Sequence, residues 1–592
     1  MGERPNHVYE FGDYRIATSD RRLWSGKGAP LALRPRVFDT LLYLVEHSGS
    51  LVEKEELMAA IWPDQIVEEN NLSQNISTLR RALGEKPGTP RYIMTVPGRG
   101  YRFLAQVTIQ PNETKLFRAA SSEEAGADDP SVSGARTIAV LPFQPLVLEE
   151  ENPVLELGMA DTLITKLSNS RGLIVRSLSS VRKYAAPDQD ALIAGQQLGV
   201  QSVLEGTVQR LDDQVRVSAR LMNVSDGTSL WSGSFNERLT DVFAVQDAIS
   251  QKVAQALEVQ LSGKQKQPLA GGGTSSIEAY QLFLTGRYHW NKLTPPALRT
   301  SIDFFQQATE IDPNYALAFC GMAEAHRALA ITSDVPSKET IPQAKAAARR
   351  ALEIDDSLAE PHATLVFALT WFDWDWTGAE REAKRAIDLN PNLAMAHVAY
   401  AHLLADMRRH DEAIAEAARA RRLDPVSLIV NAIEGSVLYY AGRDELARAR
   451  LEKTLELDPN FWIAHLFLGK VFLETGNYEE AIEEFTRAKD FSHGNSEAIS
   501  MLGYAWAAAG DSLRARAALK ELKSLAAQRY IPPNTFAVVH LGLGQRDETF
   551  AWLDKAYADR DVRLSFLNVD RKWASLHSDQ RFLSLLKRLG LG

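Results

Sequence analysis

One helix decides how the first hundred residues fold, and residues 70–84 read Asn70-Asn71-Leu72-Ser73-Gln74-Asn75-Ile76-Ser77-Thr78-Leu79-Arg80-Arg81-Ala82-Leu83-Gly84. Apolar residues recur at spacings of four, three and four, which predicts a single buried stripe of Leu72, Ile76, Leu79 and Leu83. The other faces carry amide, hydroxyl and guanidinium groups. These groups suit the base edges and phosphates of a DNA major groove. Gly84 is expected to end the helix.

A basic hairpin is predicted directly after this helix. Residues 91–96 and 100–103 read as two strands, and Pro97-Gly98-Arg99 forms the turn between them. The turn puts Arg99 at the tip of the hairpin. A basic tip of this kind can enter a minor groove.

Charge is distributed unevenly along the chain. Residues 70–105 hold six cations and one anion, whereas residues 53–69 hold six anions and one cation. This polarity would orient the domain on a polyanion. The whole chain has a net charge of −10, so the basic region is a local feature of an acidic protein. Residues 1–105 carry 14 Lys and Arg against 13 Asp and Glu, which argues against tight non-specific DNA binding.

From Tyr9 to about Val107 the chain resembles the OmpR/PhoB-type winged helix. The matching pieces are Phe11-Gly12-Asp13-Tyr14, Leu31-Ala32-Leu33-Arg34-Pro35, residues 38–45, residues 55–63, Leu79-Arg80-Arg81-Ala82-Leu83-Gly84 and residues 96–103. The resemblance implies a DNA-binding domain over residues 1–107, with the third helix in the major groove and the hairpin on the adjacent backbone or minor groove.

The same resemblance implies roles for individual residues. Those expected near bases are Gln74, Asn75, Ser77, Thr78 and Arg81; those expected near phosphates are Arg34, Arg80, Arg91 and Arg102, with Arg99 at the hairpin tip. Residues 63–69 would form the loop that contacts RNA polymerase. The alternative is that these arginines are ordinary solvent-exposed side chains, and that the domain contacts proteins rather than DNA.

Length and composition indicate the number of domains and the cellular environment of the protein. The 592 residues predict three to five domains. A single cysteine, Cys320, excludes an intramolecular disulfide, fits a reducing compartment and is expected to be a buried thiol rather than a nucleophile. No signal peptide or membrane segment is expected, which predicts a cytoplasmic protein. Residues 108–136 are rich in Ser, Ala, Gly, Asp and Glu and read as a flexible linker.

Residues 137–262 predict an α/β domain. Strands are expected at 137–143, 173–176, 202–210, 214–223 and 229–235, with helices at 158–169, 191–198 and 242–261. The segment resembles the TolB amino-terminal-like domain through Ile138 to Phe143, Gly158-Met159-Ala160-Asp161, Leu204 to Val208, Arg216-Val217, Arg220-Leu221 and Leu230-Trp231. Asp212-Asp213 reads as a turn rather than a metal site. No phosphate loop, ligand cluster or catalytic constellation stands out, so we expect no enzyme, cofactor or metal.

Residues 276–592, after a Gly-rich linker at 263–275, predict a tetratricopeptide (TPR) solenoid. Pro391, Pro425 and Pro459 are spaced 34 residues apart, the period of that repeat. About seven units are expected to roughly Leu553, with an insertion at 332–340 and an end cap at 573–591. The run Trp371-Phe372-Asp373-Trp374-Asp375-Trp376 is expected to pack around a turn between helices rather than stack on a ligand.

These observations favour a multidomain protein: a winged helix-turn-helix (α+β), an α/β middle domain and an all-α TPR solenoid. The leading hypothesis is a sequence-specific DNA-binding transcriptional regulator, with double-stranded promoter DNA on the winged helix and a protein or peptide in the TPR groove. The winged helix itself is a possible internal partner. The alternative is a protein-interaction scaffold whose winged helix does not bind DNA.

Overall fold

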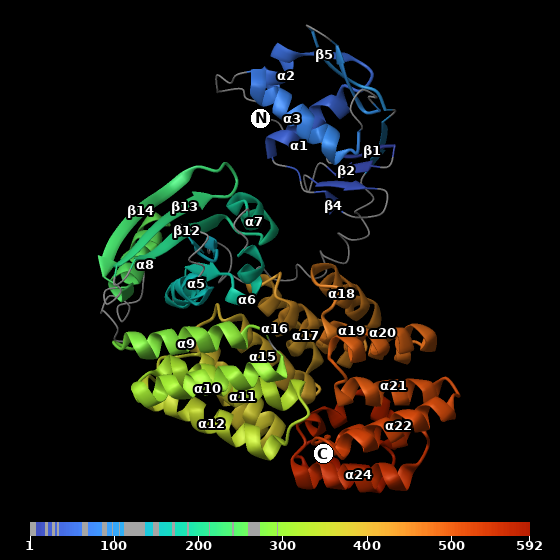
Figure 1. Cartoon of the computed structure of the whole chain (residues 1–592). Helices are drawn as coiled ribbons and strands as arrows, with labels where there is room; N and C mark the ends of the chain where they lie inside the picture. Colours follow the sequence, from blue (N-terminus) through green and yellow to red (C-terminus); the bar gives the residue numbers. More distant parts are fainter. Residues whose placement is uncertain are drawn as a thin grey trace. The chain divides into compact units, whose positions relative to one another are not determined.

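The computed structural model describes residues 7–12, 14–17, 22–25, 30–31, 33, 35–61, 69–85, 91–96, 99–105, 107–111, 136–145, 153–168, 172–185, 189–211, 214–238, 242–257, 273–292 and 294–592. The chain divides into two compact units, residues 1–133 and 134–592 (Figure 1). The predicted polymerase-contact loop, apart from Glu69, and the turn at Asp212-Asp213 lie outside the described residues.

The first unit begins with an antiparallel sheet. Its strand order is β4(Pro30–Leu31), β3(Arg22–Ser25), β2(Tyr14–Ala17), β1(His7–Phe11) and β8(Thr108–Pro111). Strand β8 pairs with β1 over four residues, within the segment that the sequence predicts as a linker. The first unit therefore continues past residue 107.

Three helices and a small sheet complete the first unit. They are α1(Pro35–Glu46), β5(Leu51–Glu53), α2(Lys54–Ile61), α3(Glu69–Ala82), β6(Ile93–Val96) and β7(Gly100–Phe103). The apolar stripe of α3 is buried as predicted, with no member more than 2% exposed. Strand β7 pairs with β5 so closely that a Cβ at Gly100 would lie 2.0 Å from the carbonyl oxygen of Val52. Glycine is therefore required where the hairpin joins the sheet.

The middle part of the second unit is a mixed sheet with helices packed on it. The strand order is β11(Leu173–Val175), β9(Arg136–Val140), β12(Ser202–Leu211), β13(Gln214–Asn223) and β14(Ser229–Arg238), with β10(Gln144–Pro145) beside β12. The helices are α5(Pro153–Ser168), α7(Ala191–Gln197) and α8(Val242–Ala256), where the sequence predicts them. The short helices α6(Leu178–Val181) and η2(Arg182–Tyr184) were not predicted.

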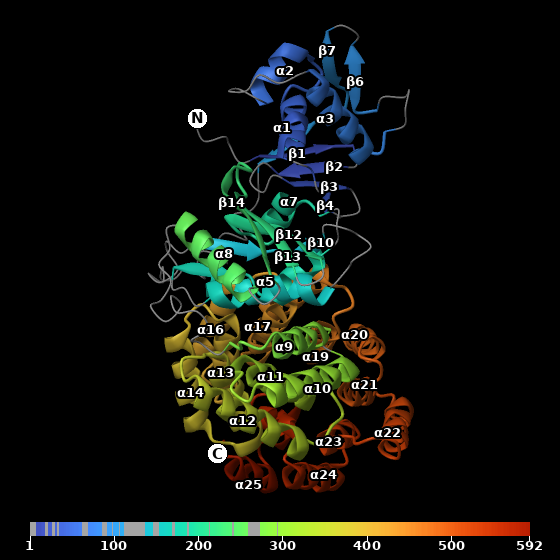
Figure 2. The same ribbon diagram turned by 60° about the vertical axis from the view of Figure 1, so that its left-hand side comes forward.

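Eight helix pairs follow in the described repeats, one more than the predicted seven (Figure 2). They are α9(Ile277–Trp290) with α10(Pro295–Ile311), α11(Ala316–Thr332) with α12(Ser337–Ile354), α13(Glu360–Ala368) with α14(Trp376–Leu389), α15(Ala394–Asp406) with α16(His410–Leu423), α17(Leu428–Tyr440) with α18(Asp444–Leu457), α19(Trp462–Glu474) with α20(Tyr478–Phe491), α21(Ser496–Ala508) with α22(Ser512–Ala526) and α23(Pro533–Gly542) with α24(Arg546–Asp559).

The irregular spacing near residue 340 has a simple structural origin. Helices α11 and α12 have 17 and 18 residues, whereas α15 and α16 of a regular pair have 13 and 14. Most of the extra residues therefore lengthen both helices rather than forming a separate loop. The tryptophan run lies at the turn of its pair as predicted, in the π-helical segment η5(Leu369–Asp373) and the start of α14.

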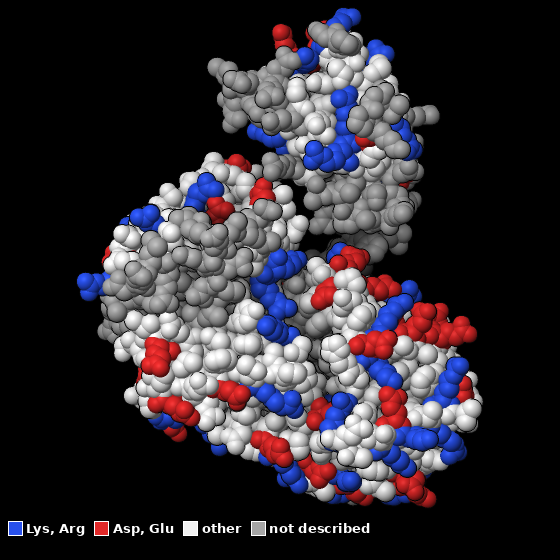
Figure 3. Space-filling view, in the orientation of Figure 1, with Lys and Arg blue, Asp and Glu red and all other residues white. Residues whose placement is uncertain are grey.

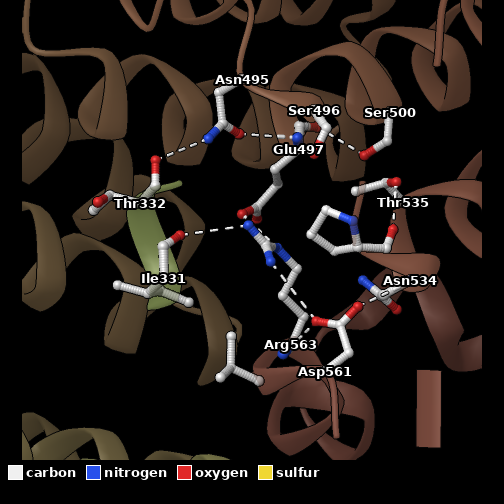
Figure 4. A network of polar contacts seen from close by, with 12 residues as sticks. Ile331, Thr332, Asn495, Ser496, Glu497, Ser500, Asn534, Thr535, Asp561 and Arg563 are labelled. Carbon is white, nitrogen blue, oxygen red and sulfur yellow. Dashed lines mark hydrogen bonds and ion pairs between the residues drawn. The ribbon is translucent and has the colours of Figure 1, made fainter. Parts of the chain in front are cut away.

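The repeat array closes on itself through a polar network at the end of α11 (Figure 4). The Asn495 amide donates to the carbonyl of Thr332 at 3.0 Å. The buried Arg563 guanidinium is 3.1 Å from Glu497 and also donates to the carbonyl of Ile331. Asp561 accepts from the backbone N–H of Asn534 at 3.0 Å. The second helix pair is thus joined to the seventh and eighth pairs.

A C-terminal segment, called the plug here, consists of η6(Val562–Asn568) and η7(Arg571–Leu576). Helix η6 packs against α11, α15 and η5. Asp570 accepts from the Tyr439 hydroxyl at 3.1 Å and lies 3.5 Å from Lys470. The inner side of the array, which we call the bore, is therefore partly filled by the chain itself. The final helix is α25(Gln580–Arg588).

The middle part docks on the repeats through buried polar contacts. Arg287 of α9 holds the carboxylate of Asp161 with two hydrogen bonds of 2.9 and 3.1 Å. Arg176 donates to the carbonyl of Leu423 at 2.5 Å. A Cβ at Gly158 would lie 2.2 Å from Leu284, so the absent side chain lets α5 approach α9. Residues 134–592 consequently behave as one compact unit.

We expect Asp161→Asn to lower the free energy of unfolding of this unit by about 2 kcal/mol, because the largely buried Arg287 loses two charged hydrogen bonds and keeps only the contact with Glu324 at 3.3 Å. Urea unfolding of the full chain followed by tryptophan fluorescence measures the change, since nine of the eleven tryptophans lie in residues 134–592. The matched control is Asp247→Asn, whose ion pair with Lys166 is about one quarter exposed. An equal loss in both variants would contradict the prediction.

Candidate nucleic-acid interface

Helix α3 presents a polar face opposite its buried stripe. Ser77, Thr78 and Arg81 are exposed on that face. Ser73 is also exposed and precedes Ser77 by one helical turn, so Ser73, Ser77 and Arg81 form a row at spacings of four. Ser73 is missing from the predicted site, although this spacing was visible in the sequence. The row offers hydroxyl groups and one guanidinium to a ligand.

Asn75 has a structural contact in this unit. Its side-chain amide donates to the carbonyl of Arg36 at 3.3 Å and to the Thr40 hydroxyl at 3.1 Å. These bonds tie α3 to α1. The predicted contact of Asn75 with bases would therefore require its side-chain amide to leave these bonds to α1. The side chain of Gln74 and the whole of Arg34 lie outside the described residues.

Arg80 joins α3 to the hairpin. Its guanidinium donates to the carbonyl of Ile93 at 3.0 Å and to the Thr95 hydroxyl at 2.7 Å. It also lies 3.5 Å from the carboxylate of Glu85. Glu85 in turn accepts from the backbone N–H groups of residues 91 and 93, both at 2.9 Å. The predicted phosphate contact of Arg80 would have to share the guanidinium with these intramolecular partners.

The hairpin carries the remaining predicted cations. Arg99 is exposed in the turn between β6 and β7. Arg91 is exposed, and its guanidinium carbon lies 5.1 Å from the ring centroid of Tyr92. Arg102 is half-buried in β7. On the face of the first unit that Figure 3 shows, Lys and Arg side chains predominate over Asp and Glu side chains, whereas the repeats mix both signs.

The structure brings Ser77, Thr78 and Arg81 together on one helix face and places Arg99 on the adjoining hairpin. Such a pair of elements can enter neighbouring grooves of a duplex. Backbone contacts from the hairpin would fix the position of the domain, and contacts from α3 would read sequence. The geometry favours DNA as the ligand of this face.

The described residues hold no group of three or more His, Cys, Asp and Glu that could bind a metal ion. Cys320 is buried, and burial raises the pKa of its thiol well above the usual value. In the part of the chain that the structure describes, no helix is both long and apolar enough to span a membrane.

Each of the three parts of the chain contains a match to a known protein family. Residues 28–103 match the family described as transcriptional regulatory protein, C terminal. Residues 134–252 match the second domain of HilA/YgeH-like transcriptional regulators. Residues 434–496 match the tetratricopeptide repeat. The chain therefore contains an OmpR/PhoB-type winged helix, a HilA-like regulator domain and C-terminal TPR repeats, whereas the resemblance to TolB stays a prediction.

Individual relatives cover different shares of the chain. The transcriptional regulator HilA of Salmonella typhimurium is 24% identical over 449 residues, which is 75% of each chain. A Rhizobium meliloti protein named "Putative adenylate cyclase 3" is 31% identical over 253 residues, and the match covers 41% of each chain. The transcriptional activator CadC of Escherichia coli is 35% identical over 101 residues, 17% of this chain and 20% of CadC.

The contacts of Arg80 and Arg81 lead to opposite predictions. Arg80→Gln should speed hydrogen exchange of the backbone amides at 91–96 by about tenfold, because the hairpin loses the hydrogen bonds of the Arg80 guanidinium to Ile93 and Thr95. Arg81→Gln should leave these amides unchanged, since Arg81 is exposed. Hydrogen exchange of the full chain with mass spectrometry makes the comparison. Equal protection in both variants would show that Arg80 does not hold the hairpin.

Proposed function

We propose that this protein is a sequence-specific DNA-binding transcriptional regulator. The observation that carries the proposal is the exposed row of α3, which stands opposite a fully buried stripe and beside a basic hairpin. Ser77, Thr78 and Arg81 would contact base edges, with Ser73 beside them. Arg99 would reach the minor groove, while Arg91 and Arg102 would contact phosphates.

The relatives support this proposal. HilA and CadC are both named as transcriptional regulators or activators, and the family of residues 28–103 is a transcriptional regulatory one. We propose no enzymatic activity for the chain. The named cyclase shares less than half of its length with this protein.

Protein partners form the second part of the proposal. The loop at 63–69 is proposed to contact RNA polymerase. The TPR array is proposed to bind a protein or peptide, which would have to bind beside the plug or displace it, because the plug already occupies part of the bore. Alternatively, the protein or peptide would bind to the outer surface of the array.

The central test is DNA binding by a double variant, Arg81→Gln with Arg99→Gln. If each arginine contributes about 1 to 3 kcal/mol, promoter affinity should fall by a factor of about 5 to 150 per residue. The slope of log affinity against log salt should change little, because the proposed phosphate contacts of Arg91 and Arg102 remain in the variant. Both residues are exposed, so the fold should be unaffected.

Genome-wide immunoprecipitation supplies the promoter sites for that test. Wild-type protein should enrich a shared sequence motif, and the double variant should lose it. Arg516→Gln, at an exposed arginine of α22, is the matched control and should keep every site. Retention of all sites by the double variant would overturn the docking model. No enrichment by a folded wild-type chain would favour the scaffold alternative.

A further inference from the structure

A cavity of about 400 Å³ lies in the bore of the second unit. The first helix of every pair from α9 to α23 lines it. Helices α5 and α6 of the middle part line one region, and the plug lines another. Three parts of the unit thus surround one space, and its volume is in the range that holds a single small organic molecule.

One region of the wall is aromatic. The ring centroids of Phe367 and Trp371 are 4.7 Å apart. His402 lies 5.8 Å from Phe367 and 6.0 Å from Phe566 of the plug. Phe566 stacks on Tyr440 at 6.0 Å. Since all five side chains line the cavity, they offer flat apolar surfaces to a ligand.

Polar groups stand beside these rings, and two of them lack a hydrogen-bond partner among the described residues. Trp371 is only 2% exposed, and its indole N–H has no partner. The guanidinium carbon of Arg327 lies 4.8 Å from the Phe367 ring centroid. Burial lowers the pKa of Arg327, and Glu324, which is within 3.3 Å of Arg287, is the carboxylate whose charge raises it. His402 is 7% exposed, and its Nδ1 atom, which donates in one ring tautomer and accepts in the other, has no partner among the described residues. A buried donor without an acceptor is costly, so this region favours an acceptor-bearing ligand.

The other charges at the cavity wall are compensated. Arg287 binds Asp161 and lies 3.3 Å from Glu324. Arg563 pairs with Glu497, and Lys470 lies 3.5 Å from both Glu497 and Asp570. Lys572 also pairs with Asp570, while Asp424 accepts from Ser180. Burial raises the pKa of Glu360, which favours its neutral form. Arg327 is therefore the cavity cation with the most capacity for an added anion.

We propose that this cavity binds a small organic carboxylate with a flat apolar body. The carboxylate would accept from Arg327 and from the indole N–H of Trp371, which lie against the same Phe367 ring. The apolar body would pack among the rings of Phe367, Tyr440 and Phe566. A charged hydrogen bond to a guanidinium is stronger than one between neutral groups. The anion would thus be selected over its neutral analogue.

The test uses the full chain without DNA, so that its outcome does not depend on the proposed function. Isothermal titration calorimetry measures the affinity of the protein for three probes, which are 2-naphthoate, 2-naphthamide and inorganic phosphate. We expect 2-naphthoate to bind at one site, the amide at least about tenfold more weakly, and phosphate not at all, since only the first offers both charge and apolar body. Absence of 2-naphthoate binding at millimolar concentration, or equal binding of the amide, would overturn the proposal.

Variants locate the bound molecule. Arg327→Gln should weaken 2-naphthoate binding about tenfold or more, and Trp371→Phe, which keeps a ring but removes the donor, about threefold. Arg349→Gln, at an exposed arginine of α12, is the matched control and should bind like the wild type. If Arg327→Gln does not fold, Arg327→Lys keeps the charge and should bind at an intermediate affinity. Unchanged binding in folded Arg327 and Trp371 variants would overturn the site.

Discussion

The buried contact between Arg563 and Glu497 holds together segments that are far apart in the chain. It joins the region after the last helix pair to α21, and Arg563 also reaches the carbonyl at Ile331. The Arg563 side chain is only 4% exposed, so the arrangement depends on the surrounding polar partners, including Asp561 and Asn495. A TPR array without such a contact would be an open superhelix. With it, the array surrounds a cavity and keeps the plug in place.

Patterns that depend on neighbours in sequence were predicted well. The stripe of α3 is buried as its spacing indicates, and the 34-residue period places the regular helix pairs. The strands of the middle part also lie where alternating residues predict them. Helical and strand periodicity encodes which face of an element is buried, and that face does not depend on the partner.

Contacts between distant segments were not predictable in the same way. Nothing near Arg563 in the sequence indicates that it meets Ile331, 232 residues away. Arg80 and Arg81 are adjacent and chemically identical, yet one is tied to Ile93 and Thr95 while the other is exposed. Their difference arises from a helical rotation of about 100° per residue combined with the position of the hairpin. The sequence alone could not divide their roles.

Ring closure also constrains how this protein can evolve. Open solenoids change length by gaining or losing a repeat, because each repeat contacts only its neighbours. Here an added pair between α11 and α21 would displace the end of the ring by one repeat, and Asn495 and Arg563 would no longer meet Thr332 and Ile331. The contact geometry therefore fixes the number of repeats between α11 and α21. Sequence changes that keep this number can still occur in the outer helices and in the residues that face the cavity.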